Sequence, residues 1–301
     1  MDQVSRSDDQ FWTRANRHLL HFGCEFASFV PARAQGCYLT ALQSGEVDVL
    51  LRNTSWTLTR ESNLGLMFAA TNFWDSTGFM AKKASGTKPA SELNNATICV
   101  RPGTSTEIDA TDWTRNHDVK FTPVLIGDVN AIQQAFLSGR CDAYTTDSSQ
   151  LAGVRFTQGA NADQLLILPE TVSPAQSGSM VRKGDDAWFD IVRWAHFAQV
   201  AGESQGVTSA SVQSQLASTN PDIRRLLGVG AGLGKSLGLD DQWGYNVITQ
   251  VGNYGEMYQR NIGPLGLPRG RNALATEGAC NPPLCCADHA FPPADAYDGR
   301  G

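Results

Sequence analysis

The sequence predicts an α/β fold with two lobes of the same kind, and three observations support this prediction. First, "ALQSGEVDVLLRN" (41–53) and "AFLSGRCDAYTTD" (135–147) repeat the same order of parts at a constant offset. Second, strand-like and helix-like segments alternate between the two copies, which is typical of a parallel sheet covered on both faces. Third, 301 residues with 41% hydrophobic side chains can bury one large core or two lobes.

Each copy of this internal echo runs from an apolar helix end to a polar residue at the exit of a strand. A Ser-Gly pair follows the helix, and its glycine can take the left-handed conformation that ends a helix. The next segment, opened by x-Asp, is interpreted as a buried parallel strand. Asn53 and Asp147 therefore occupy equivalent strand exits, one in each lobe.

The remaining elements follow in chain order. Between the copies we expect a strand at 96–100, a helix at 104–117, a strand at 119–127 and a helix at 129–139. Beyond "LLILPE" (165–170) the pattern becomes mostly helical, and these helices should pack on the first lobe. They are expected at 185–201, where Trp188, Ile191, Val192 and Ala195 share a stripe, and at 220–227, 240–252 and 255–262.

Composition and motifs exclude several functions. The net charge of −6, with no basic run, argues against nucleic acid as a partner. "GVGAGLGKS" (228–236) lacks the first glycine of a phosphate-binding loop and follows a helix instead of a strand. "CNPPLCCADH" (280–289) lacks the ligand spacing of a structural zinc site. We expect no metal, no cofactor and no hydrolase chemistry.

Two cysteines lie next to apolar strand-like runs. Cys99 and Cys141 could form a disulfide between neighbouring strands in an oxidising compartment. They could equally be buried thiols that act as small hydrophobic side chains. The residues alone leave both readings open.

The polar segment after the first strand points to a ligand site. In an open α/β sheet, ligands bind beyond the carboxyl ends of the strands. Arg60 is a planar cation suited to a carboxylate, and Asp147 is an anion suited to an ammonium group. A cleft with one of each suits an α-amino acid zwitterion.

A second anion-binding element is predicted at "RPGTSTE" (101–107). Thr104 followed by Glu107 is a capping-box pattern, and the N–H groups at such a helix start attract a carboxylate. Taken singly, these features have plainer explanations, because Arg60 could be a solvated loop residue and Thr104 a simple helix cap. Their matched positions in two echoing lobes favour the binding site.

Several long collinear stretches, covering roughly residues 38–278, resemble the general L-amino-acid-binding proteins of bacterial ABC transporters, within the class of bilobed (type 2) periplasmic binding proteins. They are "TALQSGEVDVLLRNTSWTLTR", "RPGTSTE", "GRCDAYTTDSSQL", "VRKGDDAWFDIVRW", "GVTSASV", "NPDIRRLLG" and "QVGNYGEMYQRNIG". The resemblance implies two Rossmann-like lobes joined by a two-strand hinge. It also implies a monomeric, non-enzymatic periplasmic protein that delivers an L-amino acid to the membrane subunits of a permease.

The resemblance also implies roles for individual residues. Arg60 corresponds to the arginine that holds the ligand α-carboxylate, and Asp147 to the aspartate that holds the α-ammonium. Periplasmic location favours the disulfide between Cys99 and Cys141. The first lobe would line the site with Asn53 and Ser55, and the second would add donors from Thr104 and Ser105. Trp56 is expected to pack beneath the cleft.

The expected domain organisation has five parts. Residues 1–37 lack the signal peptide, first strand and aromatic loop typical of such proteins, and Glu25 and two histidines interrupt the best signal candidate. We therefore expect a first lobe that is incomplete at its N-terminus and a lost signal. The parts are 1–37 (non-matching), 38–78 (lobe 1), 79–174 (lobe 2), 175–278 (return to lobe 1 with the C-terminal helices) and 279–301 (a Pro- and Cys-rich tail expected to be disordered).

Two other functions remain as alternatives. One is an enzyme on the same scaffold, such as a dehydratase acting on a small carboxylic acid, which would need a further acid or base in the cleft. The other is a non-functional fragment of a binding protein. The range of ligands is also open, from L-amino acids in general to glutamate, aspartate and their amides.

Overall fold

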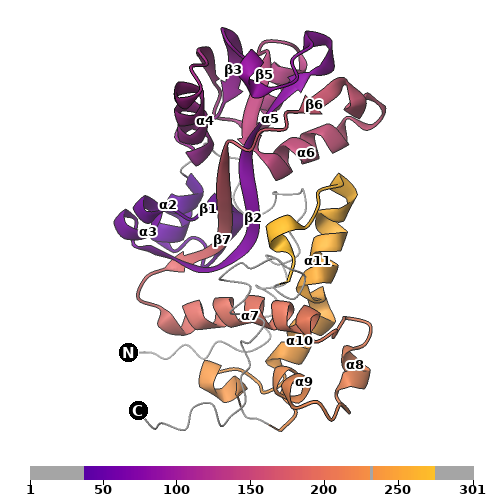
Figure 1. The fold of residues 1–301 in the computed structure, drawn as a ribbon. Coiled ribbons are helices and arrows are strands. Elements are labelled where there is room, and N and C mark those ends of the chain that lie inside the picture. The colour runs from indigo at the N-terminus through magenta and orange to yellow at the C-terminus, as the bar shows by residue number, and fades with distance from the viewer. Residues whose placement is uncertain (1–36, 231–232, 275–301) are drawn as a thin grey trace.

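Two long strands, β2 (Leu66–Lys82) and β7 (Ser173–Arg182), run side by side through the molecule and join an upper and a lower α/β lobe (Figure 1). The computed structural model describes residues 37–230 and 233–274. The strands form one sheet in the order β1-β7-β2-β5-β3-β4, with β6 paired to β2. This arrangement confirms the predicted α/β fold with two lobes and a two-strand hinge.

The upper lobe contains the elements predicted between the two copies of the echo. Strands β3 (Ala96–Val100), β4 (Phe121–Leu125) and β5 (Ala143–Asp147) are parallel to one another. Side-chain caps at Thr104 and Asp128 begin the first two helices that cover these strands. The other elements of this lobe are α4 (Ser105–Asn116), α5 (Val129–Leu137), α6 (Ser148–Thr157) and β6 (Leu165–Ile167).

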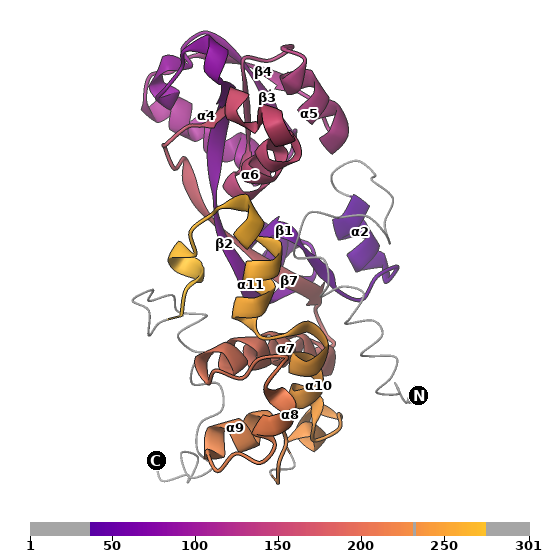
Figure 2. The ribbon, with the colours of Figure 1, turned by 90° about the vertical axis from the view of Figure 1, so that its right-hand side faces the viewer.

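The lower lobe holds β1 (Leu50–Ser55), two short helices beside it and the C-terminal helices. The predicted stripe on α7 (Asp186–Ser204) faces the lower core, where Trp188 and Ala195 are buried and Ile191 packs against them. Among the C-terminal helices, the one at Tyr254–Asn261 lies above this helix and the others lie below or beside it (Figure 2). The remaining helices are α2 (Cys37–Ser44), α3 (Leu58–Asn63), α8 (Val212–Gln215), α9 (Pro221–Leu226), α10 (Trp243–Val251) and α11 (Tyr254–Asn261).

Short 3₁₀ helices complete the described chain. They are η1 (Lys83–Ser85), η2 (Ala90–Glu92), η3 (Gly159–Gln164), η4 (Gly234–Leu237), η5 (Gly263–Leu265) and η6 (Gly270–Asn272). The glycine-rich stretch 228–236 lies between α9 and α10 and includes the start of η4. It therefore follows a helix and not a strand.

One strand prediction is wrong, and the strands β2, β6 and β7 were not predicted from the pattern. We expected β1 to be parallel, but it pairs antiparallel with β7, with Leu50 opposite Met180. Small and polar residues make β7 look like a loop in the sequence. They are needed there because β7 lies between two strands at close range: a Cβ at Gly178 would lie 2.3 Å from the carbonyl oxygen of Ala70.

The glycines of the echo behave as predicted. Gly45 directly follows α2 and has φ of 80°, and Gly139 lies two residues after the end of α5 and has φ of 86°. Both values lie in the left-handed region that side chains with a Cβ seldom adopt. Each copy of the echo therefore makes the same helix-to-strand turn.

Cys99 on β3 and Cys141, just before β5, form a disulfide, with Cα atoms 5.6 Å apart. Both cysteines are buried in the core of the upper lobe. The bond links two neighbouring parallel strands below the edge at which their polar residues emerge.

Some expectations lie outside the described residues, namely the segment 1–36, the tail 279–301 and the cysteine-rich stretch 280–289 within it. In the ranges 37–230 and 233–274, no helix is both long and apolar enough to cross a membrane. The same ranges contain no group of three or more metal-ligating side chains suited to an ion.

Candidate functional site

Two side-chain hydrogen bonds connect the lobes where β1 and the upper strands end. Asn53 Nδ2 donates to Asp147 Oδ2 at 2.7 Å. The hydroxyl oxygens of Ser55 and Ser105 lie 2.9 Å apart and form a second hydrogen bond, in which either hydroxyl can donate. Asn53 and Ser55 both lie on β1, in the stretch where its pairing with β7 is irregular. Four of the six predicted ligand-binding residues thus meet in pairs between the lobes.

Arg60 joins this group from α3. Thr57 is the N-cap of this helix, and its hydroxyl accepts a hydrogen bond from the backbone N–H of Arg60 at 3.3 Å. The side chain turns back toward β1, and Nη1 donates to the carbonyl oxygen of Ser55 at 2.7 Å. Its charge is close enough to Asp147 to lower the pKa of that carboxyl. The predicted cation and anion therefore lie in the same region, on facing lobes.

Thr104 caps the start of α4, as predicted, by accepting a hydrogen bond from the backbone N–H of Glu107 at 3.0 Å. The return bond of the predicted capping box is displaced by one residue, because the Glu107 carboxylate accepts from the N–H of Gly103 at 2.6 Å. Gly103 takes a left-handed conformation, with φ of 71°, which turns its N–H toward Glu107. The N-terminus of α4, where Ser105 is the first residue, still lies at the contact between the lobes.

Asp147 has a strongly perturbed pKa. Burial and, after it, the neighbouring charge of Asp75 raise its pKa to about 7. The Asn53 hydrogen bond and the charge of Arg60 oppose this rise. Asp147 therefore titrates near neutral pH in this arrangement, and a cation beside it would favour the ionised form.

Asp75 was missed in the sequence. It lies on β2, where its carboxylate accepts from the hydroxyl of Ser149 at 2.5 Å and from the backbone N–H of Ser76 at 2.8 Å. Burial raises its pKa in spite of these bonds. The only signal in the sequence was an aspartate between aromatic and small residues in "FWDSTG", which also fits a turn.

Two further contacts extend the polar network along the hinge. The hydroxyls of Ser76 and Ser148 lie 2.8 Å apart, which ties β2 to the start of α6. Thr77 donates to Asp109 on α4 at 2.8 Å. The carboxylates of Asp75, Asp109 and Asp147 thus lie on or near the hinge strand β2.

Trp56 packs beneath the site, as expected. Its ring stacks on Phe68 with centroids 5.0 Å apart, and its N–H donates to Glu61 at 2.6 Å. The ring therefore supports the loop between β1 and α3.

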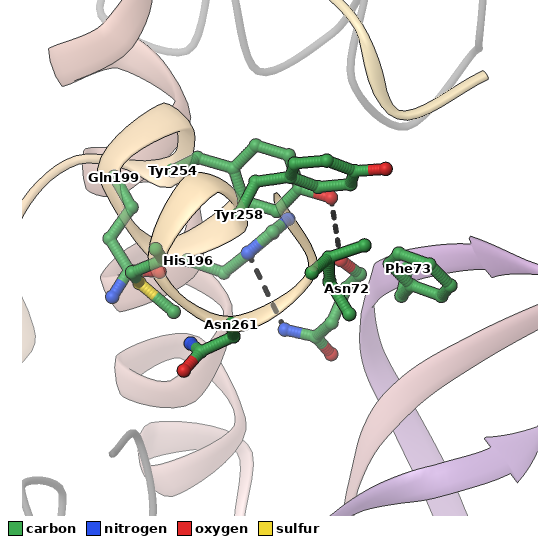
Figure 3. Close-up of a pocket in the computed structure, with 9 residues that line it drawn as sticks. Asn72, Phe73, His196, Gln199, Tyr254, Tyr258 and Asn261 are labelled. Carbon is green, nitrogen blue, oxygen red and sulfur yellow. Dashed lines mark hydrogen bonds between the residues drawn. The ribbon is translucent and has the colours of Figure 1, made fainter. Parts of the chain in front are cut away.

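A separate small cavity lies behind the hinge, between β2, α7 and α11 (Figure 3). Its volume of about 20 Å³ suits one water molecule and is too small for an amino acid. The Nδ2 of Asn72 lies 3.4 Å from Nδ1 of His196, and burial lowers the pKa of His196 to about 4. Tyr254 donates to the carbonyl oxygen of Asn72 at 2.9 Å. This region braces the hinge and contains none of the predicted ligand-binding residues.

No family model matches the chain. Among curated proteins, it is 48% identical to the glutamate/glutamine/aspartate/asparagine-binding protein BztA of Rhodobacter capsulatus, over 83% of this chain and 75% of that protein. It is 44% identical to the general L-amino acid-binding periplasmic protein AapJ of Rhizobium johnstonii, over 83% and 74% of the two chains.

A solved structure gives the same result. The chain resembles an ABC transporter periplasmic binding protein from Brucella ovis with glutathione bound, with a TM-score of 0.82 and 43% identity. The match covers 90% of this chain and 86% of that one. Similarity at this level, over most of both chains, shows that this protein belongs to the family of periplasmic amino-acid-binding proteins of bacterial ABC transporters.

Proposed function

We propose that this protein binds an L-α-amino acid between its lobes, with Arg60 holding the α-carboxylate and Asp147 the α-ammonium. The observation that carries the proposal is the meeting of these opposite charges on facing lobes at the ends of β1 and β5. A zwitterion placed between them satisfies both charges at once, whereas a ligand with a single charge satisfies only one.

The carboxylate side combines a guanidinium with a helix N-terminus. The bond from Arg60 to the carbonyl oxygen of Ser55 orients the guanidinium and leaves other N–H groups for a ligand. The start of α4 adds the partial positive charge of its first N–H groups, with the hydroxyl of Ser105 beside them. Thr104 acts here by holding the turn before α4 in shape.

The ammonium side is formed by Asp147 and Asn53. Asn53 already donates an N–H group to the carboxylate, so a ligand ammonium would compete with or join this amide. The carboxylate is buried in the upper lobe, so an ammonium there gains a strong attraction at low solvent exposure. Ligand binding and lobe closure would then stabilise each other.

Membership of the family supports a proposal for the cellular role. We place the protein in the periplasm as a monomer that delivers its ligand to the membrane subunits of an amino-acid permease. The buried Cys99–Cys141 disulfide supports an oxidising compartment. Lobe boundaries at 78/79 and 174/175 would fall within the long strands β2 and β7, which supports bending at these strands as the opening motion.

Thermal denaturation with matched ligands tests the proposal. L-glutamine should raise the melting temperature, because a ligand bound only by the folded state stabilises it. N-acetyl-L-glutamine, which lacks the ammonium, and L-glutamine amide, which lacks the carboxylate, should not. An equal rise with either derivative would refute the two-charge site.

The same titration separates the alternatives. We propose a binding protein without turnover, as the relatives are named binding proteins. Bound ligand recovered unchanged by mass spectrometry supports this, and a converted product would favour the enzyme. A panel of the common L-amino acids together with glutathione that produces no shift at all would favour the non-functional fragment.

A further inference from the structure

Arg101 is a second cation of the site that the function proposed above leaves unused. It directly follows β3, and its carbonyl oxygen accepts a hydrogen bond from the hydroxyl of Thr104 at 2.8 Å. The register pairs Cys99 with Tyr144, so Arg101 stands one position before the level of Asp147 on the neighbouring strand. The two residues therefore leave adjacent parallel strands at the same edge of the sheet.

The charge of Arg101 has no carboxylate partner among the described residues. Its Nε donates to the carbonyl oxygen of Gly127 at 3.2 Å, which holds the half-buried side chain toward the loop between β4 and α5. Other half-buried arginines have such partners: Arg182 pairs with Asp48 at 3.0 Å. Since a guanidinium has five donors, Arg101 keeps several for a further group.

A second guanidinium approaches from the facing lobe. Arg52 lies on β1, with its guanidinium over the ring of Tyr38, 4.8 Å from the ring centroid. Burial lowers the pKa of Arg52, and the nearby charge of Arg101 lowers it further. The charge of Arg101 is therefore close enough to that of Arg52 to repel it, and an anion beside Arg101 would reduce this repulsion.

The sheet order separates the charges of the site. Because β5 lies between β2 and β3, the carboxylates of Asp75 and Asp109 lie toward the hinge strand and Arg101 lies on the far side of Asp147. A ligand whose ammonium sits at Asp147 can extend its side chain away from the hinge, toward Arg101. The end of that side chain then meets positive charge.

We propose that Arg101 binds a carboxylate at the end of the ligand side chain, so that the preferred ligands are acidic amino acids. This proposal rests on the proposed amino-acid site. A guanidinium binds a carboxylate through two parallel charge-assisted hydrogen bonds, which an amide cannot match. The site therefore favours L-glutamate over L-glutamine, although the two are almost identical in size.

Isothermal titration of the full chain with these two amino acids tests the proposal. The unmodified protein should bind L-glutamate at least about tenfold more tightly than L-glutamine at pH 7.5 and physiological salt. Arg101→Gln removes the charge but keeps an N–H donor, and it should weaken L-glutamate binding by about tenfold or more. Its affinity for L-glutamine should stay within about threefold, so that the preference disappears.

Arg115→Gln is the matched control. Arg115 is an exposed residue of α4 whose side chain is 72% accessible, and its substitution changes the net charge by the same amount. It should leave both affinities unchanged, because exposed charges at a distance are screened. An equal loss of L-glutamate binding in this variant would refute a direct role for Arg101.

Two further outcomes have distinct meanings. Equal affinities of the unmodified protein for both amino acids, or an equal loss of both in Arg101→Gln, would overturn the role of Arg101 and leave the amino-acid site intact. Absence of binding for both amino acids in the unmodified protein would overturn the preference for acidic ligands, and absence of binding for the whole panel of common L-amino acids and glutathione would overturn the proposed function itself.

Discussion

Asn53 and Asp147 stand 94 residues apart in the chain, and their side chains are joined by a 2.7 Å hydrogen bond between the lobes. They are the closing residues of the two copies of the internal echo. Asn53 lies two residues before the end of β1 and Asp147 ends β5, so equivalent positions of the two copies face each other. A site built in this way opens when the lobes separate and forms when they meet.

Arg60→Ala should weaken amino-acid binding by about a hundredfold or more, because it leaves a desolvated ligand carboxylate without its partner. Isothermal titration with L-glutamine measures the change. Arg115→Ala, on the exposed face of α4, should leave the affinity unchanged. A dissociation constant that stays within threefold of the unmodified protein would show that Arg60 does not hold the ligand.

Binding should weaken as the pH falls below 7. The pKa of Asp147 is raised to about 7, so below that pH its carboxyl is protonated and an incoming ammonium must displace the proton. The dissociation constant should therefore rise by about tenfold per pH unit, or about a hundredfold between pH 7 and pH 5. Titration in buffers of different ionisation enthalpy should detect the proton that is released.

Asp75→Asn provides a control for this pH profile. The charge of Asp75 raises the pKa of Asp147, so its removal should move the fall in affinity to lower pH. An affinity that does not change between pH 8 and pH 5 in the unmodified protein would exclude Asp147 as the ammonium partner.

Asp147→Asn should stabilise the folded protein at pH 8. The folded pKa of about 7 is above the ordinary value for aspartate, so the folded state holds the proton more tightly than the unfolded state does. The stability from this difference is present at low pH and is lost as the pH rises through 7. At pH 8 the buried carboxylate is ionised, and replacing it should raise the melting temperature by about 5 °C.

At pH 5 the same substitution should change the melting temperature much less, because the carboxyl of Asp147 is then neutral in the folded state. The variant should also lose amino-acid binding at both pH values. Destabilisation at pH 8 would mean that Asp147 acts as a structural anion in the folded state.

Reduction of the Cys99–Cys141 disulfide should destabilise the upper lobe. The two cysteines are 42 residues apart, and release of a loop of this length costs about 4 kcal/mol in the chain-entropy description. Urea unfolding with and without a thiol reductant measures the difference in free energy. Because both cysteines are buried, the bond should resist the reductant until the lobe unfolds. Equal unfolding midpoints with the bond intact and broken would contradict this prediction.

The sequence was most informative where its pattern was local. The alternation between 96 and 147 was enough to predict the strands and helices of the upper lobe, since each element has a clear apolar face and a capping or turn residue at its end. The hinge was not predictable in this way. Most residues of β7 before Met180 are small or polar, and only the close packing of neighbouring strands on both sides explains the burial of this segment.

The site divides in the same manner. Ser55 and Ser105 were assigned from the family resemblance. Asn53 and Asp147 could be singled out from the repeat, Thr104 from its capping pattern at the start of a predicted helix, and Arg60 as the cation in the polar segment after the first predicted strand. Asp75 could not, because it lies within a strand that the sequence pattern did not distinguish from a turn. Asp75 matters because it accepts a hydrogen bond from Ser149 on α6 and because its charge raises the pKa of Asp147.

By itself, the amino-acid sequence determined which chemical groups this protein places around its strand ends: arginines, an aspartate and the hydroxyl and amide groups between them. Only the tertiary structure decided how those groups behave. It brought the two strand ends within hydrogen-bond distance, buried Asp147 beside Asp75 and thereby moved its titration to about pH 7. The physical reason is that a residue's identity is local, whereas its solvation and its neighbouring charges depend on the packing of segments far apart in the chain.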